Sequence, residues 1–597
     1  MATAVALALG AAAPSQSIEF SIASGEVTGS FDTTLSLGAR WRMEKPDPAL
    51  IGIANGGTAR SVNEDDGNLN WDRGDPVSLA AKATHDLDLN YRNYGAFLRA
   101  TYFYDDAVMS KSGLSSEARD QAGRDFEVLD AYVRGDFDVG DRWLGLRLGR
   151  QVVNWGESTF IQNGINVLNP IDVSRLRIPG SELREGLMPL NMLWGSHDLT
   201  DRLSVEGTWM LEWEETRIDP AGTFFSSNDF LSPGGENVFV GFGRLNDLTS
   251  PETNPPGTTI GAPRGPDREA KDSGQYGVAL RYFAEQFNHT EFGLYHVRYH
   301  SRTPFASGIK GAPTAYEQGQ QIVIVPDGSG GFVPAPAGVP AAGYFAEYPE
   351  DIRVNGVSFN TPGPWGIALQ GEYSYRPNQP VQIAAPELLL AALGQQSQIP
   401  DGGMIPLGGE IQGYERVRMQ QVQLAATKAF GPTFGAQQLV TVGEVGYTHL
   451  NLPSDIPFNA PGVFLPAPES SRQTSFGSAQ EMGYASRSSW GYRLLGRMDY
   501  PNAIGGATLS PRVAFSHDVK GRSPTFNEDA KALTLGLGIN YLQNWQADIS
   551  YTSFFGGDTI SGTDPVPNPF GQPQTYSSQT NPLKDRDFLA ISISYSF

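Results

Sequence analysis

The chain has 597 residues, and its 65 acidic against 43 basic side chains give a formal charge of −22, which argues against nucleic-acid binding. Cysteine is absent, so disulfides and thiolate metal sites are excluded. The mean hydropathy is −0.30, yet 11% of the residues are aromatic. The sequence contains no apolar run of about 18 residues, so it predicts no transmembrane helix.

The N-terminal segment is rich in alanine and leucine and resembles the apolar part of a signal peptide. Pro14 disfavours cleavage directly after Ala13, so we expect the cut between Ser15 and Ile18. Residues 1–17 are then the remnant of a signal peptide, with a short Ala-rich helix as the alternative. Residues 18–30 are predicted to form a periplasmic N-terminal segment.

From residue 31 to residue 597 the chain alternates apolar and polar residues with a period of two, as strands with one apolar face do. Most of these segments have the length of about 9–11 residues that a tilted strand needs to cross a bilayer. The segments, about eighteen in all, are 31–43, 77–91, 94–104, 126–139, 142–151, 189–197, 203–213, 276–283, 290–300, 352–360, 365–375, 414–430, 438–449, 491–500, 507–519, 533–542, 545–555 and 587–597.

The connections between these segments alternate between short ones, such as 92–93, and long ones, such as 214–274. Outer-membrane barrels have short periplasmic turns and long extracellular loops. We therefore predict an all-β fold, a transmembrane antiparallel β-barrel of about 18 strands (16–18). Both ends of the barrel sequence then lie on the side of the short turns.

The segment Leu589–Phe597 sets Ile, Tyr and Phe on one face and Ser on the other, and it resembles the C-terminal strand of bacterial outer-membrane barrels. It predicts the outer membrane of a Gram-negative bacterium, with outer-membrane lipid and lipopolysaccharide as surroundings. An arginine that faced lipid near mid-membrane would cost about 2–4 kcal/mol, so charged strand residues are expected to face inward. The predicted lumen residues are Arg147, Phe97, Phe103 and Glu372.

Residues 152–188 form the third long connection and are predicted to fold into the barrel, because a lumen of this size is too wide for wall side chains to fill. Mixed charges among Asn and Pro suit an ordered loop across a wet cavity. The same residue types would also pin the loop to the wall, so both roles stay open. The candidate constriction residues are Trp155, Glu157, Asn163, Asn166, Asn169, Asp172, Arg175, Arg177, Glu182 and Arg184.

One apolar segment in a long loop, 386–394, starts with Pro and ends with Gly, which predicts a short helix. It is either a loop helix packed on its neighbours or an apolar entrance for a substrate. Acidic clusters at 64–66, 72–75 and 105–106 are predicted to lie on external loops. Their carboxylates would bind calcium or other divalent ions that bridge lipopolysaccharide. The alternative is that these clusters are only solvated acidic loops.

The most distinctive residues lie in 149–158, 163–172, 176–180 and 183–186, supported by 299–302, 356–360 and 371–378. Together they resemble a proteobacterial family catalogued as domain of unknown function 1302, over residues 18–597. The resemblance implies an outer-membrane barrel of a kind often encoded near a periplasmic lipid-carrier-like protein and an RND-type inner-membrane transporter, which are then its expected partners. It thus implies a trans-envelope route for lipids or other hydrophobic molecules.

An outer-membrane enzyme is the rival class, and it would need a histidine-centred constellation. His517 and Asp518 follow Ser516, but adjacent strand residues point to opposite faces. His296 and His300 would lie about 13 Å apart on one strand, too far to share a metal. We therefore predict no catalytic residue, cofactor or metal. A general or substrate-selective porin for polar solutes remains the alternative to a route for hydrophobic molecules.

Overall fold

The computed structural model describes residues 18–247, 260–317, 320–326, 332–400, 402–472, 479–563 and 575–597, and the predicted signal segment 1–17 lies outside them. Eighteen antiparallel strands pair in chain order and close into a barrel where β2 pairs with β29. This confirms the predicted fold class. The barrel strands are β2 (Val27–Arg42), β3 (Pro76–Tyr91), β4 (Tyr94–Asp105), β5 (Arg124–Val139), β6 (Arg142–Gln151), β7 (Leu190–Thr200), β8 (Leu203–Met210), β11 (Tyr276–Ala284), β12 (Thr290–Tyr299), β18 (Ile352–Pro362), β19 (Ile367–Gln382), β21 (Tyr414–Phe430), β22 (Gln438–Leu450), β23 (Ser488–Ile504), β24 (Ala507–Lys520), β25 (Ala530–Tyr541), β26 (Trp545–Gly556) and β29 (Phe588–Ser596).

The two faces of the barrel wall differ in polarity as the alternation requires. On β29, Ile591 and Ile593 are each 42% exposed on the outer face, while Ser592 and Ser594 face a cavity in the lumen. On β25 the outward Leu535 is likewise 53% exposed. A closed barrel with an apolar outer band and a polar interior is the architecture of an outer-membrane protein. No helix within the described ranges is long and apolar enough to span a bilayer.

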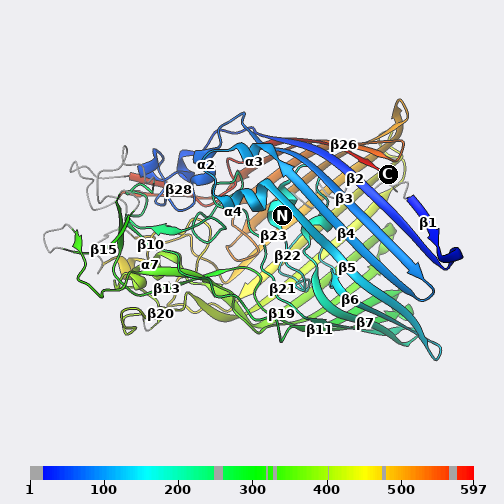
Figure 1. Cartoon of the computed structure of the whole chain (residues 1–597), viewed down its shortest axis with the longest axis horizontal. Coiled ribbons are helices and arrows are strands. Elements are labelled where there is room, and N and C mark those ends of the chain that lie inside the picture. Colours follow the sequence, from blue (N-terminus) through cyan, green and yellow to red (C-terminus); the bar gives the residue numbers. More distant parts are fainter. Residues whose placement is uncertain are drawn as a thin grey trace.

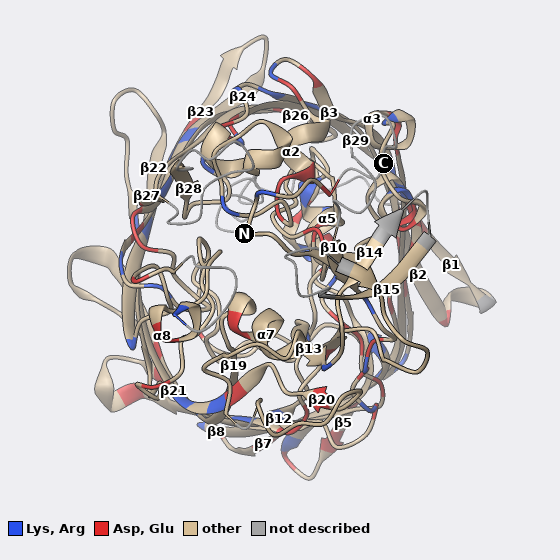
Figure 2. Cartoon of the chain, turned by 90° about the vertical axis from the view of Figure 1, so that its left-hand side faces the viewer, with Lys and Arg blue, Asp and Glu red and all other residues tan. Residues whose placement is uncertain are grey.

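The long loops gather at one end of the barrel into a cap, at the left of Figure 1 and facing the viewer in Figure 2, and the short turns lie at the other end. The described strands of the cap pair in three small sheets, ordered β16-β15-β14-β10-β9, β17-β13-β20 and β27-β28. The strands are β9 (Asn237–Phe239), β10 (Ile260–Pro263), β13 (Phe305–Ile309), β14 (Thr314–Glu317), β15 (Gln320–Pro326), β16 (Phe332–Pro334), β17 (Gly343–Glu347), β20 (Glu410–Ile411), β27 (Thr559–Thr563) and β28 (Thr575–Gln579). The helices are α2 (Asp66–Asn70), α3 (Asp106–Ser110), α4 (Ser116–Ala118), α7 (Ala385–Ala392) and α8 (Pro468–Ser471), with short turns η2 (Pro48–Leu50), η3 (Ile53–Asn55) and η4 (Arg119–Gly123).

Helix α7 is the predicted apolar helix, shifted by one residue at its start. Pro386 lies in its first turn, and Gly394 follows its end with a φ of +67°. Leu388 and Leu390 are 5% and 0% exposed, because they pack into the apolar interior of the cap. The helix is therefore part of the packed cap.

The predicted N-terminal segment 18–30 is a hairpin at the short-turn end. β1 (Ile18–Ile22) pairs with Val27–Phe31 of β2 through the turn η1 (Ala23–Gly25). Ile18 and Ile22 are more than half exposed. Two further short turns, η5 (Glu285–Phe287) and η6 (Pro364–Gly366), connect barrel strands.

The facing of β29 can be tested with one charge placed on either side of the strand. Ile591→Arg should lower the free energy of unfolding by up to about 2–4 kcal/mol, because the charge faces lipid. Ser594→Arg should change it little, because that side chain faces the polar lumen cavity. Denaturant titration in lipid vesicles measures both, and equal losses would contradict the assigned faces.

Candidate transport pathway

The loop 152–188 lies across the barrel interior, and Asn169 ties its two ends together. The side chain of Asn169 accepts a hydrogen bond from Val153 N (2.9 Å) and donates to the carbonyls of Gln151 (3.2 Å) and Met188 (2.9 Å). One amide thereby satisfies the backbone of both ends of the loop. Asn166 contributes a second internal contact, donating to Asn154 Oδ1 at 3.0 Å.

Trp155 fixes the first part of the loop to the wall formed by β8, β11 and β12. Its indole Nε1 donates to Glu206 Oε2 at 2.9 Å, and its ring packs 6.1 Å from that of Tyr295. The backbone of Gly277 faces this ring, and a Cβ there would come within 2.5 Å of it. Glycine on the wall thus makes room for a tryptophan that is only 2% exposed.

Two carboxylates further along the wall, on β19 and β22, accept the backbone N–H groups of the loop. Glu372 accepts from Glu157 (2.7 Å), Ser158 (3.2 Å) and Ile165 (2.9 Å), and Glu444 accepts from Thr159 (2.9 Å), Phe160 (2.6 Å) and Ile161 (2.8 Å). Both carboxylates are at most 4% exposed. Hydrogen bonds to an ionised acceptor are the strong kind, so this clamp fixes the loop against β19 and β22.

The carbonyl groups of the same stretch are also satisfied by wall side chains. Arg376 donates to the carbonyls of Asn163 (2.8 Å) and Gly164 (2.6 Å), and Gln421 donates to Gln162 O at 2.6 Å. Asn163, with a left-handed φ of 63°, turns its amide to Pro524 O and Thr525 Oγ1 at 3.2 Å. A backbone buried away from water needs such partners, and here the barrel wall supplies them.

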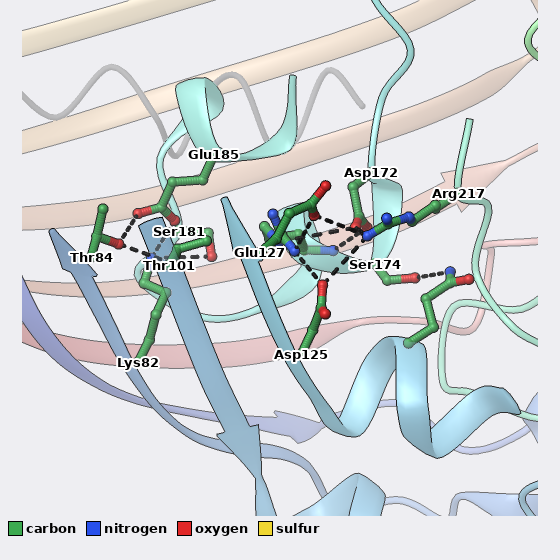
Figure 3. Close-up of polar contacts among 12 residues, drawn as sticks. Lys82, Thr84, Thr101, Asp125, Glu127, Asp172, Ser174, Ser181, Glu185 and Arg217 are labelled. Atoms are coloured by element: carbon green, nitrogen blue, oxygen red, sulfur yellow. Dashed lines mark hydrogen bonds and ion pairs between the residues drawn. The ribbon is translucent and has the colours of Figure 1, made fainter. Parts of the chain in front are cut away.

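The second half of the loop is held by charge pairs on the side of β3 and β5 (Figure 3). Asp172 caps α5 (Val173–Arg177), accepting from Arg175 N at 2.8 Å. Arg175, which is 1% exposed, pairs with Asp125 and Glu127 on β5, and Arg217 joins the same carboxylates. The two guanidinium groups pair with the three carboxylates Asp125, Glu127 and Asp172, so this acidic cluster is an ion-pair network.

The tip of the loop reaches β2, β3 and β29. Lys82 on β3 pairs with Glu185 of α6 (Leu183–Gly186), and Thr84 donates to the same carboxylate at 3.2 Å (Figure 3). A Cβ on Gly180 would touch that of Ser592 on β29 at 3.0 Å. The loop is therefore held on all sides and divides the barrel interior.

A cavity of about 120 Å³ remains between the loop tip and the wall, and we call it the lumen cavity. Its loop side presents apolar Leu176, Ile178 and Pro179 together with polar Ser181, Glu182 and Glu185. Its wall side is mainly polar and includes paired charges, with Arg512 bonded to both oxygens of Asp548 at 2.5 and 2.9 Å. The wall residues are Thr34, Ser36, Arg40, Lys82, Arg497, Ser510, Arg512, Gly538, Ile539, Asn540, Gln546, Ala547, Asp548, Ser550, Ala590, Ser592 and Ser594.

The predicted constriction residues mostly bind the loop to itself or to the wall. Glu182 also lines the lumen cavity and pairs with Arg184 at 2.6 Å. Arg177 is bonded to both oxygens of Asp219, and Glu157 accepts from Asn360 at 3.1 Å. The sequence patterns did not single out Arg40, Lys82, Arg497 and Arg512 on the wall. The alternating serines of β29 were the signal that this part of the wall borders a polar space.

The predicted lumen residues lie on the inward register of their strands. Arg147 stacks on Trp194 at 4.5 Å, and Phe97 packs with Tyr132. Phe103, 5% exposed, packs under Ile178 of the loop. Glu372 lies beneath the loop as one of the two clamping carboxylates.

The histidines form no catalytic arrangement within the described residues. His300 lies within 4.8 Å of Glu350 and Asp351, but both its ring nitrogens are bonded to backbone. Its Nδ1 accepts from Asp351 N at 2.9 Å, and its Nε2 bonds to Ser273 O at 3.0 Å. Burial lowers the pKa of His300.

The acidic cluster predicted at 64–66 lies in the cap, with Asp65 buried and Glu64 and Asp66 half-buried. Burial raises the pKa of Glu64 to about 7 and that of Asp66 to about 6, and it raises those of Asp65 and Asp229 well above the ordinary value. Asp65 accepts from Gly52 N at 2.7 Å, and Asp229 accepts from Asp66 N at 3.1 Å. At the end of β4, Asp105 caps helix α3.

The chain matches the model of one protein family over its whole length, residues 1–597. That family is described as protein of unknown function (DUF1302). The chain belongs to this family. The predicted resemblance is thereby confirmed, while a search of curated proteins gives no match.

Among solved structures, OccAB1 of Acinetobacter baumannii is similar with a TM-score of 0.40 and 10% identity, over 98% of this chain and 99% of that one. The outer membrane protein opdK of Pseudomonas aeruginosa has a TM-score of 0.38 and 8% identity, over 95% and 98%. OccK2 (OpdF) of P. aeruginosa, solved in complex with glucuronate, has a TM-score of 0.37 and 9% identity, over 95% of this chain and 98% of that one.

The two-carboxylate clamp can be tested by removing its charges. Replacing both Glu372 and Glu444 with Gln should loosen the loop, because neutral acceptors form weaker hydrogen bonds and part of each amide now donates. Single-channel recordings should show larger and noisier conductance than in the unaltered protein. The matched control is Asp88→Asn, a wall carboxylate that in the described structure accepts its side-chain hydrogen bonds from Arg134 and Asn90. An unchanged conductance in the double variant would contradict the clamp.

The cap should lose stability as pH rises, because its buried acids have raised pKa values. An acid with a raised folded-state pKa stabilises the fold below its unfolded pKa of about 4, and this contribution is lost as pH rises through the folded pKa. For Asp66 and Glu64 that window extends to about pH 6 and 7. Hydrogen exchange of residues 49–70 should be faster at pH 8 than at pH 5, beyond the intrinsic effect of pH. Glu64→Gln should reduce the difference.

Proposed function

We propose that this chain is an outer-membrane channel whose substrates pass through the lumen cavity. We further propose that these substrates are lipids or other hydrophobic molecules that carry a polar group. The protein would then be the outer-membrane part of a trans-envelope route. The observation that carries the proposal is the mixed lining of the lumen cavity, which combines apolar and polar residues.

The lining suits a molecule that carries both apolar and polar groups. Leu176, Ile178 and Pro179 offer apolar contact from the loop side. Ser510, Asn540 and the other polar groups of the wall offer hydrogen bonds from the opposite side. Because the loop is clamped by buried hydrogen bonds and ion pairs, this difference between the sides is built into the resting structure.

A porin for polar solutes is the second candidate, and the wall of the lumen cavity favours it. The hydroxyl groups and the Arg512–Asp548 pair would replace part of the hydration of a small polar solute. Such a solute needs no apolar contact. The two candidates therefore differ in whether the apolar loop side matters for passage.

The proposed periplasmic partners are a lipid-carrier-like protein and an RND-type inner-membrane transporter. The short-turn end is where such a partner would dock. The β1–β2 hairpin supports this placement, because β1 pairs only with β2 and both its isoleucines are exposed. Outer-membrane lipid and lipopolysaccharide would surround the apolar outer band.

Thiol labelling can test the pathway, since the chain contains no cysteine. A bulky cationic thiol reagent on Ser510→Cys or Ser594→Cys should block most of the current through the channel, because both side chains line the lumen cavity. Met482→Cys, 66% exposed in a loop, is the control and should leave the current unchanged. Persistence of full current after labelling of both cavity positions would contradict the pathway.

The substrate class can be tested separately by mass spectrometry of molecules that co-purify in mild detergent, together with planar-bilayer recording. A hydrophobic route predicts bound lipids or other apolar molecules and small currents. Leu176→Ser should then reduce passage of an amphipathic probe and leave that of a small sugar unchanged. Large steady currents without bound apolar molecules would favour the porin.

A further inference from the structure

Two cavities of the cap adjoin at Glu64. The larger has a volume of about 270 Å³ and the smaller about 70 Å³. They share six lining residues: Ser61, Glu64, Phe230, Ala385, Val463 and Phe464. The two spaces adjoin across these residues, and together they are here named the Glu64 chamber. It lies in the packed loops beside helix α7, away from the loop 152–188.

The smaller half of the chamber is apolar. Leu388 and Leu389 of α7 form one side of it, and Phe242 and Val238 contribute from the strands and turns opposite. Apolar walls with a few convergent polar groups are the ordinary composition of a small-molecule pocket. The two volumes together lie at the lower end of the range of about 300–1,000 Å³ for such pockets. The space suits a molecule of one or two rings and is too small for a whole phospholipid.

Glu64 is the polar group that faces this apolar space. Its Oε2 atom is buried and has no hydrogen-bond partner within the described part of the chain. A buried acceptor without a partner costs about 1–3 kcal/mol, so a ligand that donates to it gains an interaction the free protein lacks. Burial and the neighbouring Asp247 hold the pKa of Glu64 near 7, while Ser61 bonds to the carboxyl group and lowers it.

The charges around Glu64 decide which donor fits. Burial is the main cause of the raised pKa values of Asp65, Asp66 and Asp229, followed by the neighbouring carboxyl groups. Glu64 and Arg60 are the acidic and the basic residue of the lining, and Arg60 stacks on the ring of Tyr576 at 5.2 Å. Glu64 Oε2 is therefore the acceptor left for a ligand, so the chamber favours a head that donates hydrogen bonds and disfavours a carboxylate.

We propose that the Glu64 chamber is a binding site for small apolar molecules that carry an amine, and more weakly for those that carry a hydroxyl group. The ring system lies in the apolar half beside α7, and the head donates to Glu64 Oε2. The role of the chamber as the first binding site at the outer face rests on the proposed function, whereas binding of a ligand in the chamber does not.

Binding can be measured with three probes that share one ring system: 2-naphthylmethylamine, 2-naphthol and 2-naphthoate. Titration calorimetry on the detergent-solubilised full chain should give affinities in that order, with the amine at least tenfold tighter than the carboxylate. Glu64→Gln should weaken the amine at least tenfold and the naphthol only a few fold, because the glutamine oxygen still accepts. Glu481→Gln, at an exposed position, is the charge control.

Filling the chamber separates specific binding from uptake into the detergent. Leu389→Trp should weaken all three probes, whereas Leu407→Trp, at a 61% exposed position, should weaken none. An unchanged melting temperature and proteolysis pattern establishes that each variant is folded. Equal affinities for the three probes, or an undiminished affinity for the amine in Glu64→Gln, would overturn the site.

The outcomes also separate this site from the proposed function. Probe passage through the lumen cavity without Glu64-dependent binding would reject the chamber and leave the channel standing. Glu64-dependent binding in a protein that passes neither current nor probe would reject the channel and leave the chamber standing.

Discussion

The interior of this barrel depends on two buried carboxylates that accept six backbone N–H groups from one loop. Without Glu372 and Glu444, residues 157–165 would carry unpaired amides into a space walled by protein, and each buried unpaired group costs about 1–3 kcal/mol. The loop, in turn, has glycine where its backbone lies closest to Glu372. A Cβ at Gly156 or Gly164 would collide with the Glu372 carboxylate, so the loop can approach it only as glycine. Wall and loop therefore specify each other, and the loop forms part of the barrel interior.

The clamp has a consequence for the space that remains. Because the first half of the loop is fixed to β19 and β22 and the second half to β3 and β5, the open volume is displaced toward β24, β25, β26 and β29. Strand faces supply hydroxyl and amide groups there, while the loop turns Leu176, Ile178 and Pro179 toward them. A pore lined by strands alone would be polar all round. The loop therefore adds Leu176, Ile178 and Pro179 to the lining, beside its own Ser181, Glu182 and Glu185, and selectivity for amphipathic molecules would change with this loop.

How much of this could be read from the sequence follows from the range of each interaction. Strand alternation is local, so Leu589–Phe597 and the other barrel strands were predicted with end shifts of at most four residues, except that β19 ends seven residues later than predicted. The helix at 385–392 was predicted because Pro and Gly mark its ends. The role of Glu372 needed the register between β19 and a loop some two hundred residues away, which no local pattern encodes. The cap sheets were missed for the same reason: Phe305–Ile309 and Gly343–Glu347 are short, buried and paired across a long insertion.

The two cavities place different demands on a molecule that passes from the cap to the lumen. The Glu64 chamber offers an apolar space and an acidic acceptor, whereas the lumen cavity offers a longer polar wall with basic Arg40, Lys82, Arg497 and Arg512 among its residues. Three of these four cations are already paired with carboxylates, at Glu185, Asp499 and Asp548, so the wall repels a cationic head less than their number suggests. A molecule held tightly by Glu64 would also leave slowly. Passage through the channel is favoured by weak, successive contacts. The affinity of the Glu64 chamber for a transported molecule therefore has an upper limit.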